Sequence, residues 1–174
     1  MSEYVIGKLM GRCGNQFYQI ATSYAYARKH GLQHFVTSYA QNCDNDANYF
    51  RGLVPAQDFA PNYFDEKRDS RGLAIYQEIP ALKNVLLIGY WQSFDYFNEY
   101  REEILNLFNL PYELKSGYVS LHVRRGDFLK GENNECVLSN DYYRNAIDHF
   151  YSKGYRNFLV FSDDIPHCKS VFND

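Results

Sequence analysis

Several patterns that would assign a function are missing from the sequence. No run approaches the roughly 18 apolar residues that a membrane-spanning helix needs. The N-terminus, Met-Ser-Glu-Tyr, lacks the basic segment and apolar run of a signal peptide. Cys13, Cys43, Cys136 and Cys168 form no C-x-x-C pair and no zinc spacing, so we expect reduced thiols. These absences favour a cytoplasmic protein, with peripheral membrane association as the alternative.

The chain also lacks an excess of positive charge. It has 18 Lys and Arg against 21 Asp and Glu, and its net charge of −3 argues against a nucleic-acid binder. Its five histidines form no H-E-x-x-H, and no G-x-S-x-G is present, so a hydrolase has no support. What is abundant is aromatic: 17 Tyr and 13 Phe serve core packing and also suit contacts with sugar rings.

The first third of the chain has the pattern of an α/β protein. We predict a strand at Tyr4–Met10, a glycine turn at Gly11–Asn15, and a helix at Gln16–His30 that ends at Gly31. A second strand is predicted at His34–Tyr39. Strand, turn, helix and strand in this order open a parallel α/β sheet.

The middle of the chain is less regular. Residues 41–80 contain three prolines and several Asn and Asp, which predicts loops with short helices. A buried strand is predicted at Val85–Trp91. An amphipathic helix follows at Phe94–Phe108 and is stopped by Pro111.

A second α/β unit begins near residue 116. Alternating apolar residues predict a strand at Tyr118–Arg124, followed by a helix at Asp141–Lys153 and a strand at Phe158–Phe161. Ser139 or Asn140 is the expected helix cap, and Gly154 the stop. The expected domains are 1–115 and 116–174, divided in the Pro111–Gly117 stretch.

The strongest chemical pattern is His122-Val123-Arg124-Arg125-Gly126-Asp127 at the carboxyl end of a predicted strand. Ligands of open α/β sheets bind beyond these ends. Paired guanidiniums suit phosphate oxygens, and Gly126 allows a close backbone approach or a positive φ. The alternative is a pair of surface arginines, one of them oriented by Asp127.

Two further segments follow predicted strands. Gly11-Arg12-Cys13-Gly14-Asn15-Gln16 places two glycines before a helix, where free N–H groups bind anions; alternatively, it is a plain turn with Asn15 as cap. Phe161-Ser162-Asp163-Asp164 brings carboxylates that could accept hydrogen bonds from guanine, bind a metal, or cap the next helix.

A competing pattern is the D-x-D at Asp44-Asn45-Asp46, which in one class of glycosyltransferases holds a divalent metal ion. Its surroundings are rich in Asn and Asp and do not form a strand end. Asx-turn chemistry explains it, so we expect no metal site.

Taken together, four segments resemble glycosyltransferase family 11, the α-1,2-fucosyltransferases. The family's G-x-x-G-N-Q, G-Y-W-Q-S…Y-F, H-x-R-R-G-D and F-S-D-D-I motifs match segments that begin at Gly11, Gly89, His122 and Phe161, in family order. The third motif is shared by the wider α-1,2, α-1,6 and O-fucosyltransferase superfamily.

The resemblance implies a GT-B fold of two Rossmann-like halves with the active site between them, the first on the acceptor side and the second binding GDP-fucose. By matching position, Arg124 grips the β-phosphate. Asn15 lies near the diphosphate and fucose. His122 and one of Asp163 or Asp164 approach the guanine or ribose. The remaining implied donor-site residues are Gly11, Gly14 and Arg125.

The implied reaction is inverting transfer of L-fucose from GDP-fucose to a galactoside 2-OH, without a metal ion. Arg124, Arg125 and Asn15 would stabilise the departing diphosphate, and Asp127 is the candidate base or an orienting group. The family's later S-x-x-F-S-W-W stretch is missing before Asp174, so the second domain is expected to be incomplete. The alternative is therefore an inactive remnant that binds glycan or a protein.

Overall fold

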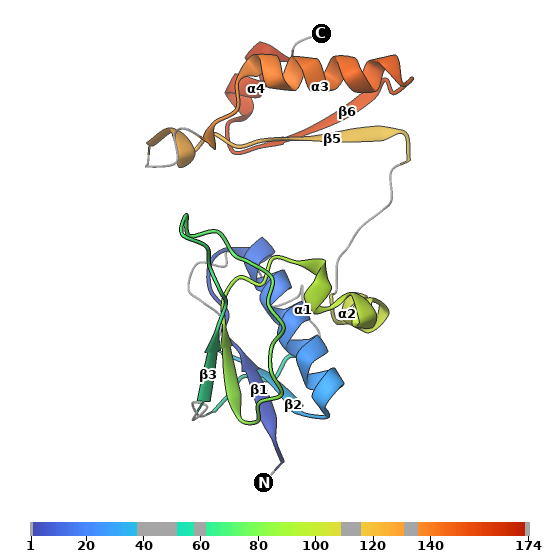
Figure 1. The fold of residues 1–174 in the computed structure, drawn as a ribbon. Coiled ribbons are helices and arrows are strands. Elements are labelled where there is room, and N and C mark those ends of the chain that lie inside the picture. Colours follow the sequence, from blue (N-terminus) through green and yellow to red (C-terminus); the bar gives the residue numbers. More distant parts are fainter. Residues whose placement is uncertain (1, 38–51, 58–61, 109–115, 131–135, 173–174) are drawn as a thin grey trace. The chain divides into compact units, whose positions relative to one another are not determined.

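A computed structural model describes residues 2–37, 52–57, 62–108, 116–130 and 136–172 (Figure 1). The chain divides into two compact units, Met1–Pro111 and Tyr112–Asp174, and each is described by itself. Pro111 is the first residue of the stretch in which the sequence places the domain boundary.

The first unit is built on a parallel sheet in the order β2-β1-β4-β3. Its strands are β1 (Tyr4–Gly7), β2 (Gln33–Val36), β3 (Asn62–Asp65) and β4 (Val85–Ile88). Three of them lie within or beside predicted strands, whereas β3 lies in the segment predicted as loops. Its edge position explains the miss, because only Phe64 of this strand is partly buried and the apolar alternation is weak.

Helix α1 (Cys13–His30) follows β1 and packs against the sheet. Its core partners include Val5, Tyr26, Val85 and Trp91. The helix ends at Gly31 in the left-handed conformation, as predicted. It begins earlier than predicted, because the N-cap position is Arg12, and Asn15 lies inside the first turn. The alternative in which Asn15 is the cap is therefore wrong.

The segment predicted as one helix at Phe94–Phe108 is divided. Two short 3₁₀ turns, Phe94–Tyr96 and Asn98–Tyr100, precede α2 (Arg101–Leu107). The Ser93 hydroxyl accepts a hydrogen bond from the Asp95 N–H, and Phe97 leaves the helical region with φ −143°. Side-chain capping and the packing of Phe97 against the ring of Tyr18 therefore override the helical pattern.

The second unit pairs β5 (Tyr118–Val123) and β6 (Asn157–Ser162) in parallel. Along β5, Val119, Leu121 and Val123 are buried and alternate with exposed residues, as predicted. Helices α3 (Asn140–Ser152) and α4 (Ile165–Val171) complete the unit. Ser139 caps α3 as predicted by accepting a hydrogen bond from the Tyr142 N–H.

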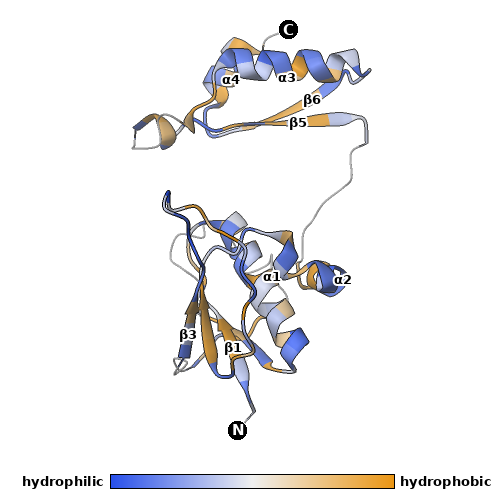
Figure 2. Cartoon of the chain, in the orientation of Figure 1, coloured by the Kyte–Doolittle hydropathy of each residue, from blue (hydrophilic) through white to orange (hydrophobic). Residues whose placement is uncertain are grey.

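Hydrophobic residues concentrate in the strands, whereas helix α3 carries many hydrophilic residues (Figure 2). Within the described ranges, no helix has both the length and the apolar character needed to cross a membrane.

Candidate donor site and family

The carboxyl ends of β5 and β6 bring two of the sequence motifs together. The strands pair in register from Tyr118 with Asn157 to Val123 with Ser162, so the residues that follow them emerge side by side. The Ser162 hydroxyl donates to the Val123 carbonyl at 2.7 Å. The Arg125 N–H donates to Asp163 Oδ1 at 2.9 Å. This edge is the place where open α/β sheets bind ligands.

Arg124 is held between two carboxylates. Its Nη2 lies 2.7 and 2.8 Å from the two carboxylate oxygens of Asp127, and its Nε lies 3.2 Å from Asp163 Oδ2. The guanidinium also lies over the Phe128 ring, 5.4 Å from its centroid. The side chain keeps 29% of its surface exposed. Arg124 is therefore a fixed but accessible cation, and Asp127 orients it.

Arg125 and Asp164 form a second pair, with Arg125 Nε 3.1 Å from Asp164 Oδ2. Asp164 also caps α4, because its Oδ1 accepts from the His167 N–H at 3.1 Å. The capping alternative of the sequence is thus confirmed for Asp164.

Hydrogen bonding lowers the pKa of both aspartates at this edge. The Arg125 N–H is the main cause that lowers the pKa of Asp163. The His167 N–H, followed by the Arg125 side chain, lowers the pKa of Asp164. Both carboxylates therefore carry a negative charge at neutral pH and hold their arginines in place.

Gly126 packs closely against the side chain of Asp163, and its φ is not positive. A Cβ at this position would lie 2.6 Å from Asp163 Oδ2. The glycine therefore lets the loop after β5 meet the Asp163 carboxylate. His122 lies on the exposed face of β5, the same face as Ser120.

In the first unit, the loop after β1 is held by two buried glutamines of α1. Gln19 Oε1 accepts from the Met10 N–H, and its Nε2 donates to the Met10 carbonyl. Gln16 Nε2 donates to the Gly11 carbonyl at 3.2 Å. Gly11 has φ +72°, and a Cβ there would lie 2.5 Å from Asn15 Nδ2, so only glycine suits it.

The first turn of α1 presents the positive end of the helix dipole. It contains no acidic residue, and the Arg12 side chain makes no capping hydrogen bond. The positive end of the helix dipole is therefore not compensated there by a local carboxylate. A Cβ at Gly14 would meet nothing within 4 Å, so packing inside the unit does not explain this glycine.

A residue that the sequence analysis missed holds the loop after β4. Glu66 is buried, and its two carboxylate oxygens accept from the N–H groups of Tyr90 and Trp91 at 3.1 and 2.6 Å. Trp91 has a positive φ of 55°, which these bonds stabilise. Arg68 pairs with Glu66 at 3.2 Å. Because Glu66 follows the unpredicted strand β3, the sequence pattern contained no sign of it.

The described ranges contain no group of three or more His, Cys, Asp or Glu side chains arranged to hold a metal ion. Asp44 and Asp46 lie outside the described residues. Cys136 and Cys168 are free cysteines.

Comparison with known proteins gives relatives that include two fucosyltransferases and a colitosyltransferase. Galactoside alpha-(1,2)-fucosyltransferase 2 of Sus scrofa is 29% identical over 94% of this chain and 55% of its own length. Galactoside 2-alpha-L-fucosyltransferase SEC1 of Bos taurus is 29% identical over 94% of this chain and 50% of its own length. An alpha-1,2-colitosyltransferase of Escherichia coli is 32% identical over 52% of this chain and 37% of its own length. The chain thus spans about half the length of the first two relatives.

Two solved structures share the fold. The crystal structure of the NodZ alpha-1,6-fucosyltransferase soaked with GDP-fucose matches with a TM-score of 0.57 and 11% identity, over 99% of this chain and 75% of that chain. A NodZ structure from Bradyrhizobium matches with a TM-score of 0.56 and 14% identity, over 99% and 76%. The fold is therefore α/β of the GT-B type, as predicted. Because the family model for glycosyl transferase family 11 matches residues 8–173, the chain belongs to glycosyltransferase family 11.

Proposed function

We propose that the full-length protein transfers L-fucose from GDP-β-L-fucose to the 2-OH of a galactoside, with inversion at the anomeric carbon and without a metal ion. Membership of family 11 and the names of the relatives support this reaction. The observation that carries the proposal is the arginine pair after β5, which the aspartates after β6 hold in place.

The chemistry follows from the charge that develops as the bond to fucose breaks. Negative charge builds on the departing diphosphate, and a fixed cation stabilises it more in the transition state than in the ground state. The carboxylates of Asp127 and Asp163 preorganise Arg124 for this task. Arg125, fixed by Asp164, is proposed to add a second cation to the donor site.

The histidine and the aspartates of this site are proposed to bind the nucleoside or to hold the arginines in place. His122 and Asp163 are proposed to contact the guanine or ribose, whereas Asp164 mainly anchors Arg125 and α4. Asp127 is engaged by Arg124, so we propose it as an orienting group in place of a general base.

The start of α1 is proposed to contribute to donor binding. Gly11 shapes the turn, and Gly14 leaves space beside the first-turn N–H groups, where a phosphate can approach the backbone. Asn15 presents its side-chain amide in the same turn and is bonded to Gln92.

The test is a transfer reaction with the full-length protein, GDP-fucose and lactose, followed by NMR assignment of the product linkage. An α-1,2-linked fucosyl-lactose is expected. Since the relatives transfer either fucose or colitose according to their names, GDP-colitose and GDP-mannose serve as competing donors. A clear preference for another donor, or a different linkage, would replace the proposed reaction.

A further inference from the structure

The loop after β4, which contains the second family motif, contacts the start of α1 at two points. Gln92 Nε2 donates a hydrogen bond of 2.9 Å to Asn15 Oδ1. The Tyr90 ring lies against Gly11, since a Cβ at Gly11 would be 3.1 Å from Tyr90 Cε1. Both contacts lie at the carboxyl end of the sheet, because β1 and β4 pair in parallel. The motif that begins at Gly89 therefore reaches the turn of the proposed donor site, although it supplies none of the proposed donor-binding residues.

The backbone on both sides of Gln92 is held by hydrogen bonds. Before it, the N–H groups of Tyr90 and Trp91 donate to the buried carboxylate of Glu66 at 3.1 and 2.6 Å. After it, the Ser93 N–H donates to the Trp91 carbonyl at 2.8 Å. Gln92 itself is exposed. It is thus a polar side chain at the surface on a firmly held backbone.

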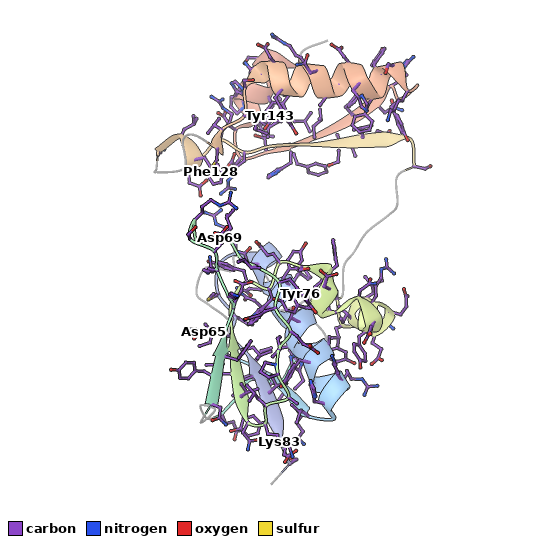
Figure 3. The ribbon with its side chains drawn as sticks, in the orientation of Figure 1. Asp65, Asp69, Tyr76, Lys83, Phe128 and Tyr143 are labelled. Carbon is purple, nitrogen blue, oxygen red and sulfur yellow. The ribbon has the colours of Figure 1, made fainter. Side chains whose placement is uncertain are left out.

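This loop contains an unfavourable backbone conformation, because Trp91 has a positive φ of 55°. The left-handed region is disfavoured for a large side chain, and residues held there concentrate at functional sites. Trp91 stays in it because its side chain is buried in the core and its N–H is bonded to Glu66. Glu66 directly follows Asp65, the last residue of β3, which Figure 3 labels. The turn at Trp91 brings the next residue, Gln92, to α1.

The hydrogen bond from Gln92 determines the orientation of the Asn15 amide. A side-chain amide has an acceptor end and a donor end, and half a turn exchanges them. Because Oδ1 is engaged by Gln92, Nδ2 lies on the side of the Gly11 turn, where a Cβ at Gly11 would be 2.5 Å from it. The first turn of α1 contains no acidic residue. Nδ2 therefore adds a hydrogen-bond donor at the positive end of the helix dipole, where an anion is favoured.

We infer that Gln92 is a positioning residue for the proposed transfer: it holds the Asn15 amide with Nδ2 toward the diphosphate of the donor. The inference rests on the proposed function. Negative charge builds on the diphosphate as the bond to fucose breaks, so a donor group oriented in advance stabilises the transition state more than the ground state. Without Gln92, the amide can also turn its carbonyl oxygen toward the phosphate, which repels it. Gln92 therefore acts on the rate of transfer more than on donor affinity.

The test is a double-mutant cycle in the full-length protein with GDP-fucose and lactose. Gln92→Met removes the hydrogen bond at similar side-chain length. It should lower kcat about tenfold, the effect of one hydrogen bond, and change the Kd of GDP less than about twofold. Asn15→Ala combined with Gln92→Met should be no slower than Asn15→Ala alone, because Gln92 acts through Asn15. Gln33→Ala, at an exposed glutamine of β2, is the matched control and should change neither value.

Recovery by a different donor group separates positioning from folding. Gln92→Lys supplies an ammonium that can donate to Asn15 Oδ1, so it should recover part of the rate, and none of it when Asn15 is replaced by alanine. Gln92→Met should keep the Tm of the wild type, because Gln92 is exposed. The inference would be overturned by an unchanged kcat in Gln92→Met, by an equal further loss in the Asn15→Ala background, or by a fall in Tm without recovery in Gln92→Lys.

An NMR measurement without donor distinguishes this inference from the proposed function. The two side-chain N–H signals of Asn15, identified by their loss in Asn15→Ala, should move in Gln92→Met and stay in place in Gln33→Ala. If the wild type transfers no fucose from GDP-fucose, the proposed function fails, while movement of these signals still shows that Gln92 orients Asn15. Signals that stay in place in Gln92→Met would overturn the inference even in an active enzyme.

Discussion

Asn15 and Gln92, 77 residues apart in the chain, are joined by a hydrogen bond of 2.9 Å from Gln92 Nε2 to Asn15 Oδ1. The bond links the first turn of α1 to the loop after β4, at the carboxyl end of the sheet in the first unit. Two of the four family motifs therefore form one structural feature, in the same way that the parallel pairing of β5 and β6 unites the other two.

Arg124 is expected to dominate transfer. Arg124→Ala should lower kcat/KM roughly a hundredfold or more, a loss on the order of 3 kcal/mol of transition-state stabilisation. Arg124→Lys keeps the charge but loses the planar guanidinium that can bind phosphate through two N–H groups, so it should recover only part of the rate. GDP release with a galactoside acceptor measures both, and circular dichroism checks folding. Arg144→Ala, at an exposed arginine of α3, is the control. Near wild-type kcat/KM in folded Arg124→Ala would exclude Arg124 as the phosphate anchor.

Metal independence follows from the proposed role of the arginines. The full-length protein should keep its transfer rate in excess EDTA, measured with GDP-fucose and lactose. Loss of activity on chelation and its recovery with Mn²⁺ would instead support a metal site at Asp44 and Asp46.

Gly11 and Gly14 should respond differently to alanine. Gly11→Ala is expected to lower stability, because φ is positive and the Cβ meets Asn15. Gly14→Ala should keep or raise stability, since alanine favours a helix over glycine by up to about 1 kcal/mol. It should nevertheless weaken GDP-fucose binding at least about tenfold if phosphate approaches this backbone. Thermal unfolding and calorimetry give the two values. Unchanged donor affinity in Gly14→Ala would argue that nothing binds there.

Glu66 should contribute strongly to the free energy of unfolding of the first unit. Glu66→Gln replaces one acceptor oxygen by an amide donor that faces an N–H group, and should cost about 3 kcal/mol of unfolding free energy. Arg68→Ala should cost less, because the Arg68 side chain is 44% exposed. Urea unfolding followed by tryptophan fluorescence measures both. Equal losses in the two variants would contradict the dominance of the backbone hydrogen bonds.

His34 should make the first unit sensitive to acid. Desolvation lowers the pKa of His34 to about 4, while the unfolded chain has a value of about 6.5. Between these values the unfolded state binds more protons, so stability falls as the pH drops from 6.5 to 4, by up to about 3 kcal/mol. His34→Gln should flatten this dependence. Urea unfolding at several pH values tests it, and an unchanged slope in His34→Gln would refute it.

Local pattern was enough to determine most elements. The alternation along Tyr118–Val123, the Ser139 cap and the Gly31 stop each depend on residues within one or two turns, so the sequence alone locates them. The same holds for the four motifs that identify the family. Local pattern did not predict edge strand β3 or the division of the 94–108 segment. The exposure of β3 hid its alternation, and side-chain capping by Ser93 interrupts the helix.

Only the tertiary structure decided which side chains meet. The pairing of Arg125 with Asp163 and Asp164 depends on the register of two strands, and that of Asn15 with Gln92 on the parallel order of β1 and β4. The hydrogen bonds from Tyr90 and Trp91 to Glu66 have no local pattern either, since the partners come from segments more than 20 residues apart. Sequence periodicity reports which face of an element is buried. The partners on that face are set by packing between elements, which no single stretch of the chain encodes.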